Sequence, residues 1–242
     1  GGFIVCLAML LKRAPQDALD SFHALCELLS VDPLIDEMGW LPTLEGMSAD
    51  PKNQVDEKWR KLFYLSSHKL AIHKRALAPL LFASTTSFLD LQESIRDLSA
   101  TTSITQLAAI DNATKVLTLL NPHHYTAWNV RKRLILRCAP PGTDQLANGL
   151  ALTGEAAETV RVKCEKELLH ISLALSKQPK SLEAWAHRKW VLHTLERLCA
   201  EPVDVMREVK LCDYSINAHK RNYYAWSHRL YTLQHWIANK SD

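Results

Sequence analysis

Glycine is scarce in this chain, and its scarcity restricts the fold. Seven glycines occur in 242 residues, and none lies between Glu155 and Asp242. This C-terminal part is rich in Leu, Ala, Glu, Lys and Arg, which favour helix, whereas glycine destabilises a helix interior. Apolar residues recur there in steps of four, as at Val160, Cys164 and Leu168, and no segment alternates long enough to require a strand. The expected fold class is therefore all-α, an α-α superhelix (solenoid) of helical hairpins.

Cysteine pairs are missing as well. The six cysteines are widely scattered and form no C-x-x-C pair, so we expect free thiols in a reducing compartment and a cytoplasmic protein. His68 and His73 lie five positions apart, a poor spacing for two ligands on one helix, and His123 and His124 are adjacent and point apart. We expect no metal site in this chain.

Long apolar runs and a strong net charge are also absent. The apolar stretch over 3–11 has nine residues, whereas a membrane span needs about 20. No basic segment or small-residue cleavage site surrounds it, so we do not expect a signal peptide. The net charge of +3, without long basic runs, does not indicate a nucleic-acid or membrane partner. Because no Met opens the chain, we expect either a fragment or a sequence that lacks its true start.

What the chain does have is a repeat: three segments align on a tryptophan. Each has Ala directly before the Trp and Arg at the third position after it, and the first two have Pro at the sixth position before it. Shared offsets of this kind indicate stacked helical hairpins, since one hairpin cannot bury its apolar face alone. The three units contain Trp128 and Arg131, Trp185 and Arg188, and Trp226 and Arg229.

Each motif is expected to open the second helix of its hairpin. Pro122 and Pro179 should end the preceding helix, because proline lacks the N–H that a helix interior needs and disfavours helix at the residue before it. Ser181 and Asn222 are suited to cap the next helix. The expected helices cover 104–120, 125–138, 157–177, 182–198, 203–218 and 223–238, with an insertion loop over 139–149.

The repeated Trp and Arg have a structural interpretation. The Trp would fill the space between the two helices of a hairpin, and the Ala before it would allow close helix approach. The Arg lies one turn beyond the Trp on the same side of the helix. It could cap helix C-terminal carbonyls, pair with a carboxylate, or face a partner subunit.

The N-terminal part is less regular. We expect an N-terminal helical region with loops over 1–100 and the repeats over 101–242. Within the first region, 32–42 is expected to be a turn-rich connector, 46–53 a loop, and 59–81 one or two helices. The Ser/Thr-rich runs 83–87 and 99–103 are expected to be loops or helix starts.

The pattern Pro-x-x-Tyr-x-Ala-Trp-x-x-Arg in helix–turn–helix units resembles the repeat of protein prenyltransferase α subunits. The resemblance covers about 104–238 and extends upstream to Ile35–Pro42. It implies the α subunit of a heterodimeric enzyme, inactive alone, that supports transfer of a geranylgeranyl or farnesyl group to a cysteine of protein substrates. The implied partner is a prenyltransferase β subunit, expected to be that of the Rab-type geranylgeranyltransferase. The zinc and the prenyl diphosphate pocket belong to β, so no cofactor is expected in this chain.

The resemblance also implies roles for single residues. Lys180 matches the family's lysine that approaches the prenyl diphosphate, where a positioned cation stabilises the charge of the departing group. Without the resemblance, Lys180 would be a solvated turn lysine. Asn222 and Tyr223 match an Asn-Tyr turn near the active-site rim and are expected to pack or to face the partner.

The chain also departs from the family pattern. Leu182 stands where relatives have Tyr, and Glu183 stands where farnesyl-type enzymes use an amide to hold the substrate's terminal carboxylate. Because like charges repel, we expect Glu183 to face the substrate side without clamping a C-a-a-X terminus. The family has five or more repeats, so further helix pairs are expected beyond this chain. A non-catalytic helical scaffold remains the alternative, and RNA binding has little support.

Overall fold

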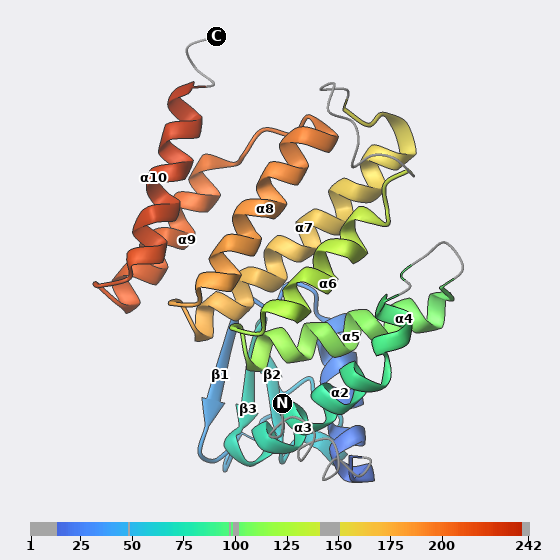
Figure 1. Ribbon diagram of the computed structural model, residues 1–242. Helices are drawn as coiled ribbons and strands as arrows, with labels where there is room; N and C mark the ends of the chain where they lie inside the picture. Colours follow the sequence, from blue (N-terminus) through green and yellow to red (C-terminus); the bar gives the residue numbers. More distant parts are fainter. Residues whose placement is uncertain (1–13, 48, 97, 99–101, 141–150, 239–242) are drawn as a thin grey trace, which may run out of the picture. The chain divides into compact units, whose positions relative to one another are not determined.

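The computed structural model describes residues 14–47, 49–96, 98, 102–140 and 151–238. They are mostly helical (Figure 1), which confirms the all-α helical-repeat class. Among them, no helix is long and apolar enough to cross a membrane. The apolar stretch 3–11 and nearly all of the expected loop 139–149 lie outside the described residues.

The chain divides into two compact units, residues 1–120 and 121–242. The predicted boundary between 100 and 101 concerns where the repeat sequence begins, and it stays a prediction. The division falls between the two helices of the first predicted hairpin, so the helix Ile104–Leu120 belongs to the first unit and the helix Tyr125–Leu136 to the second.

The first unit combines helices with a small sheet. Helix α3 packs against α2 and α5, and Leu25, Leu80 and Leu117 of these three helices are each at most 1% exposed. The elements in chain order are α2 (Gln16–Val31), β1 (Glu37–Leu41), the 3-10 helix η1 (Glu57–Trp59), β2 (Phe63–Ser66), β3 (Lys69–His73), α3 (Lys74–Asp90), α4 (Gln92–Arg96) and α5 (Ile104–Leu120).

The helix predicted over 59–81 is wrong for its first half, where the chain forms a β-hairpin. Strands β2 and β3 pair antiparallel, with Leu65 opposite Leu70. Ser67 and His68 between them both have positive φ, 52° and 62°, as a two-residue type I′ turn requires. Buried residues alternate with less buried ones on both strands. Each alternation is confined to one short strand, too short to outweigh a helical interpretation from sequence.

Two further expectations in this unit are corrected. Strand β1, which pairs parallel with β3 in a sheet of order β1-β3-β2, replaces part of the connector predicted over 32–42. The run 83–87 lies inside α3 rather than in a loop or at a helix start. There the hydroxyls of Ser84 and Thr86 donate to the carbonyls of Leu81 and Phe82 at 3.1 and 2.9 Å, so these polar side chains are satisfied within the helix.

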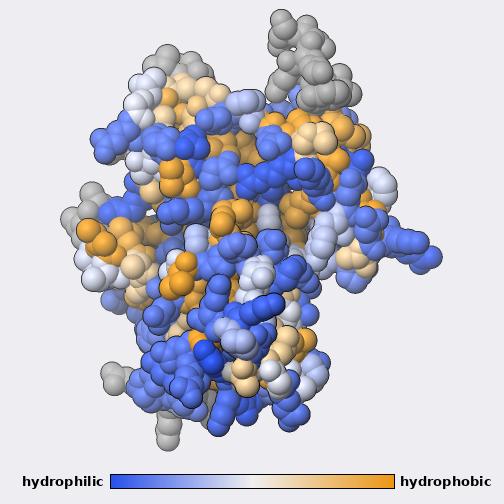
Figure 2. All heavy atoms as spheres, turned by 180° about the vertical axis from the view of Figure 1, so that it is seen from behind, coloured by the Kyte–Doolittle hydropathy of each residue, from blue (hydrophilic) through white to orange (hydrophobic). Residues whose placement is uncertain are grey.

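The second unit is a stack of helices that agree closely with the predicted bounds. Helices α7 and α8 form one hairpin and α9 and α10 the next, while α6 packs on α7 and α8 (Figure 1). Helix α10 also packs on α8. On the face shown in Figure 2, apolar side chains form several patches among hydrophilic ones. The helices are α6 (Tyr125–Leu136), α7 (Gly154–Lys177), α8 (Leu182–Cys199), α9 (Val205–Ala218) and α10 (Tyr223–Ala238).

Candidate functional site

The turns that precede α6, α8 and α10 are tied to one another by hydrogen bonds. The Pro122 carbonyl accepts from the indole Nε1 of Trp128 and from the hydroxyl of Ser181, both at 2.8 Å. Ser181, which is fully buried, also accepts from the backbone N–H of Ala184 at 3.2 Å and so caps α8 as predicted. One serine thus both starts its own helix and binds the preceding turn.

The next pair of turns repeats this arrangement. The Pro179 carbonyl accepts from Nε1 of Trp185 at 2.8 Å and from the side-chain amide of Asn222 at 2.6 Å. Asn222 also accepts from the backbone N–H of Ala225 at 3.3 Å, as the predicted cap of α10. Asn222 is buried, with its oxygen and nitrogen both engaged. The three turns, which we name the turn edge (residues 121–125, 178–183 and 219–223), are therefore held in a fixed row.

Lys180 lies on this edge, between the two anchored residues Pro179 and Ser181. Its side chain is exposed, and it makes no hydrogen bond or ion pair within the described part of the chain. The backbone position is rigid, while the ammonium group can move to meet an anion. This combination suits a cation that binds a charged group supplied from outside.

Glu183, in contrast, already has partners. Its Oε2 lies 2.9 Å from Nδ1 of His123 in the preceding turn, and the Ser181 hydroxyl donates to it at 3.4 Å. Burial alone would raise the pKa of Glu183, but the hydrogen bonds and the charge of His123 outweigh it and lower the pKa. The carboxylate is therefore ionised at neutral pH and engaged within the turn edge.

Exposed apolar residues also mark this edge. Tyr125, Leu182 and Tyr223 each begin the second helix of a hairpin, and they are 66, 51 and 76% exposed. A row of large apolar side chains beside polar residues is typical of a protein interaction surface. That Tyr223 and Glu183 face a partner stays a prediction, whereas the buried Asn222 has the packing role that was the other expectation for it.

A second, buried set of residues joins successive hairpins. Arg131 on α6 donates through Nε and Nη2 to both carboxylate oxygens of Glu167 on α7, at 2.8 and 2.6 Å. Nε2 of His187 on α8 lies 2.8 Å from the same carboxylate. Burial would raise the pKa of Glu167, but the Arg131 charge and these hydrogen bonds hold it well below its usual value. Burial lowers the pKa of His187, so a neutral imidazole donates to an ionised carboxylate.

The same triad recurs one hairpin later. Arg188 donates to both oxygens of Glu208 at 2.7 and 2.6 Å, and Nε2 of His228 lies 2.8 Å from Glu208. Burial would raise the pKa of Glu208, but the charge of Arg188 and the hydrogen bonds from His228 and Arg188 lower it to about 2. Of the three interpretations left open for the motif arginine, the structure supports pairing with a carboxylate for Arg131 and Arg188.

The four partners of these arginines were not predicted from the sequence, although the sequence contains a signal for them. In the second and third repeats, a Glu precedes the Trp at one shared spacing, and a His stands at the second position after the Trp. The signal is weak because the first repeat lacks it and has Ile110 and Val130 at these two positions. The partners are Glu167, His187, Glu208 and His228.

The third motif differs from the first two. Trp128 and Trp185 are 1 and 4% exposed, whereas Trp226 is 51% exposed. Arg229 pairs with Asp213 on α9, near the surface, rather than with a buried glutamate. The predicted architectural role thus fits the first two pairs by burial, and the third pair lies at an open face.

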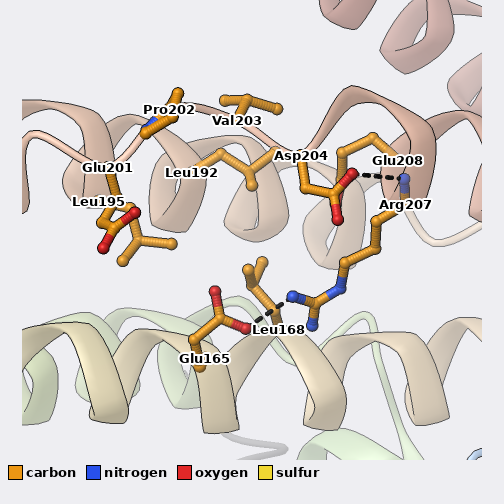
Figure 3. Close-up of a pocket in the computed structure, with 10 residues that line it drawn as sticks. All are labelled: Glu165, Leu168, Leu192, Leu195, Glu201, Pro202, Val203, Asp204, Arg207 and Glu208. Atoms are coloured by element: carbon orange, nitrogen blue, oxygen red, sulfur yellow. Dashed lines mark hydrogen bonds and ion pairs between the residues drawn. The ribbon is translucent and has the colours of Figure 1, made fainter.

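A small cavity lies between α7, α8 and the segment that leads into α9 (Figure 3). Its volume is about 50 Å³, room for one or two water molecules and not for a prenyl chain. Arg207 at its edge pairs with Glu165 at 2.6 Å. The lining residues are Glu165, Leu168, Leu192, Leu195, Glu201, Pro202, Val203, Asp204, Arg207 and Glu208.

No group of three or more metal-ligating side chains is assembled within the described residues. His68 binds Asp32 at 2.9 Å, and His73 caps α3 by accepting from the Arg75 N–H at 3.0 Å. His124 likewise accepts from the Ala127 N–H, at the start of α6. These histidines have local structural roles.

Comparison with known proteins agrees with the repeat seen in the structure. The family described as "Protein prenyltransferase alpha subunit repeat" matches residues 108–138, 164–195 and 205–236. Protein prenyltransferase alpha subunit repeat-containing protein 1 of Danio rerio is 28% identical over 93% of the chain and 46% of its own length. The human protein of that name is 29% identical over 95% of the chain and 50% of its length.

A more distant similarity is to the Geranylgeranyl transferase type-2 subunit alpha of Dictyostelium discoideum. It is 28% identical over 51% of the chain and 34% of its own length. The chain thus spans about half the length of the two repeat-containing relatives, and a smaller part of the transferase subunit.

Proposed function

We propose, from the premise that this chain belongs to the protein prenyltransferase α-subunit repeat family, that it acts as the α subunit of a heterodimeric protein prenyltransferase. The group transferred is geranylgeranyl or farnesyl, and the acceptor is a cysteine of a protein substrate. The partner is a prenyltransferase β subunit, with that of the Rab-type geranylgeranyltransferase as the first candidate. Similarity to type-2 geranylgeranyl transferase α subunits supports the geranylgeranyl donor.

The observation that carries this proposal is the exposed Lys180 on the rigid turn edge. Its neighbours Pro179 and Ser181 are fixed by hydrogen bonds to Trp185, Asn222 and the Pro122 carbonyl. The exposed apolar residues at the starts of α6, α8 and α10 provide a surface for the β subunit beside it. Docking of that surface would bring Lys180 to the mouth of the partner's prenyl diphosphate pocket.

The reaction forms a thioether. The cysteine sulfur forms a bond to C1 of the prenyl group while the C1–oxygen bond breaks and diphosphate leaves with the bonding electrons. Negative charge grows on the diphosphate as it departs, and the Lys180 ammonium would stabilise it more in the transition state than in the ground state. Thiolate activation is assigned to the zinc that the family resemblance places in β.

The test is co-purification with a prenyltransferase β subunit, followed by single-turnover assays of prenyl transfer. Lys180→Ala should slow the transfer step about tenfold or more, a loss of about 1.4 kcal/mol of transition-state stabilisation. Lys180→Arg, which keeps the charge, should retain more activity than Lys180→Ala. Lys166→Ala, which removes an exposed lysine in the middle of α7, is the matched control and should leave the rate unchanged.

A non-catalytic scaffold is the second candidate, and Glu183 favours it. An anion held in the turn edge by His123 is poorly suited to receive a substrate carboxylate. A scaffold would bind its partners through the same exposed edge. In that case Lys180→Ala would change no rate measured in the transfer assays. A complex that forms, transfers prenyl groups and is indifferent to Lys180 would remove the catalytic role of this residue.

A further inference from the structure

The turn edge carries a basic residue at one repeated position. His123, Lys180 and Arg221 each stand at the fifth position before the motif Trp of their repeat. All three are exposed. Because hydrogen bonds hold successive turns together, the three basic side chains form a row along the turn edge.

The first member of this row already has an anionic partner. Nδ1 of His123 lies 2.9 Å from Oε2 of Glu183, and Glu183 is the one acidic residue in the sequence of the turn edge. The side chains of Lys180 and Arg221, in contrast, make no hydrogen bond or ion pair with any described residue. The positive charge that an outside anion can meet is therefore at the second and third turns.

A single hydrogen bond fixes these two turns beside each other. Asn222, directly after Arg221, donates through its side-chain amide to the carbonyl of Pro179, directly before Lys180, at 2.6 Å. The helices that follow the turns, α8 and α10, pack together (Figure 1), and the axes of packed helices lie about 8–10 Å apart. Lysine and arginine side chains are long enough to meet at one anion across such a gap.

A lysine and an arginine together suit a diphosphate. The two linked phosphoryl groups of this anion can each receive a cation. A guanidinium group binds a phosphoryl group through two parallel hydrogen bonds, while an ammonium group acts as a compact point charge. The nearby carboxylate of Glu183 competes less for these cations because His123 engages it.

We propose that Arg221 is a second binding residue for the diphosphate of the prenyl donor, so that Lys180 and Arg221 each hold one phosphoryl group. The inference rests on the proposed function, in which the partner's pocket supplies the prenyl diphosphate. As the sulfur–C1 bond forms and the C1–oxygen bond breaks, the electron pair of the broken bond stays on the diphosphate. Both cations then stabilise the charge that grows there.

Titration calorimetry with inorganic diphosphate tests the site directly, on the full chain alone and on its complex with a β subunit. Arg221→Ala and Lys180→Ala should each raise the Kd about tenfold, or about 1.4 kcal/mol. Arg221→Lys, which keeps the charge, should retain more affinity than Arg221→Ala. Lys220→Ala is the matched control and should leave the Kd unchanged, because Lys220 is an exposed neighbour in the same turn but lies outside the repeated position.

Single-turnover transfer by the complex separates this inference from the proposed function. Arg221→Ala should slow transfer about tenfold, as Lys180→Ala does. If only Lys180→Ala slows transfer and Arg221→Ala changes neither the rate nor the Kd, the proposed function stands and the second cation is overturned. If the complex transfers nothing while diphosphate still binds through both residues, the proposed function fails and the diphosphate site stands.

Two further outcomes of the titration would overturn the inference. Equal weakening by Arg221→Ala and Lys220→Ala would mean that general surface charge, and not the repeated position, attracts the anion. Absence of diphosphate binding in both the chain and the complex would leave no site to which Arg221 could contribute.

Discussion

At the scale of single residues, one sequence motif has two physical environments. Arg188 is buried against Glu208, with 0 and 1% of their side chains exposed, whereas Arg229 and Asp213 are 29 and 50% exposed. Removing one member of a buried pair leaves an uncompensated charge in a poorly solvated place. Water and salt screen an exposed pair.

Arg188→Met should therefore cost about 3–5 kcal/mol of unfolding free energy, while Arg229→Met should cost no more than about 1 kcal/mol. Urea denaturation of the two variants at pH 7 measures the difference. Arg229→Met is the matched control, since it removes the same side chain from the same motif position. Equal losses would mean that burial of the Arg188 pair contributes nothing.

At the scale of elements, the turns depend on side chains with two roles. Ser181 accepts from the Ala184 N–H and donates to the Pro122 carbonyl of the preceding turn. Asp204, the N-cap of α9, accepts from the Arg207 N–H at 3.0 Å. Ser181 therefore joins two hairpins, whereas Asp204 caps only its own helix.

Ser181→Ala should cost about 2 kcal/mol, one part for the cap and another for the buried carbonyl bond. Asp204→Ala should cost about 1 kcal/mol, the usual loss for a cap. Thermal or urea unfolding of both variants checks the ranking. If the two losses are the same, the bond between turns has no net effect on stability.

At the scale of the whole molecule, stacking in the second unit depends on ionised glutamates. Glu167 bridges α6 and α8, and Glu208 bridges α8 and α10, each through one Arg and one His. Both carboxylates have lowered pKa values in the folded chain. Protonation would weaken the contact between successive helices at both steps.

Acid should therefore unfold this unit cooperatively. The pKa of Glu208 falls from 4.5 in the unfolded chain to about 2 in the folded one. Its contribution is complete above pH 4.5 and lost as the pH falls through about 2, because between these values only the unfolded state binds the proton. This shift corresponds to about 3 kcal/mol. The lowered pKa of His187 adds a loss that starts below 6.5.

Urea unfolding followed by circular dichroism between pH 7 and pH 2 measures this dependence. Glu208→Gln should lower the unfolding free energy at pH 7 and make it depend less on pH below 4.5. If the unfolding free energy of this variant falls with pH as steeply as that of the parent chain, protonation of Glu208 does not cause the acid unfolding.

The sequence alone was enough to predict the hairpins of the second unit, because helix periodicity, the prolines and the caps Ser181 and Asn222 act over a short stretch of chain. It also predicted that Lys180 lies in a turn. It did not predict the sheet around Leu65 and Leu70, whose alternations are too short to separate from helix.

Only the tertiary structure decided which motif residues are buried and which are open. Arg188 and Arg229 have the same local sequence offsets, but Arg188 meets a glutamate of the next hairpin, which approaches only when hairpins stack, whereas Arg229 meets an aspartate of its own hairpin. Glu208 lies far along the chain from Arg188, and no local rule links them. Local sequence determines helices and turns because it sets backbone preference, whereas burial and ion pairing depend on which elements pack together.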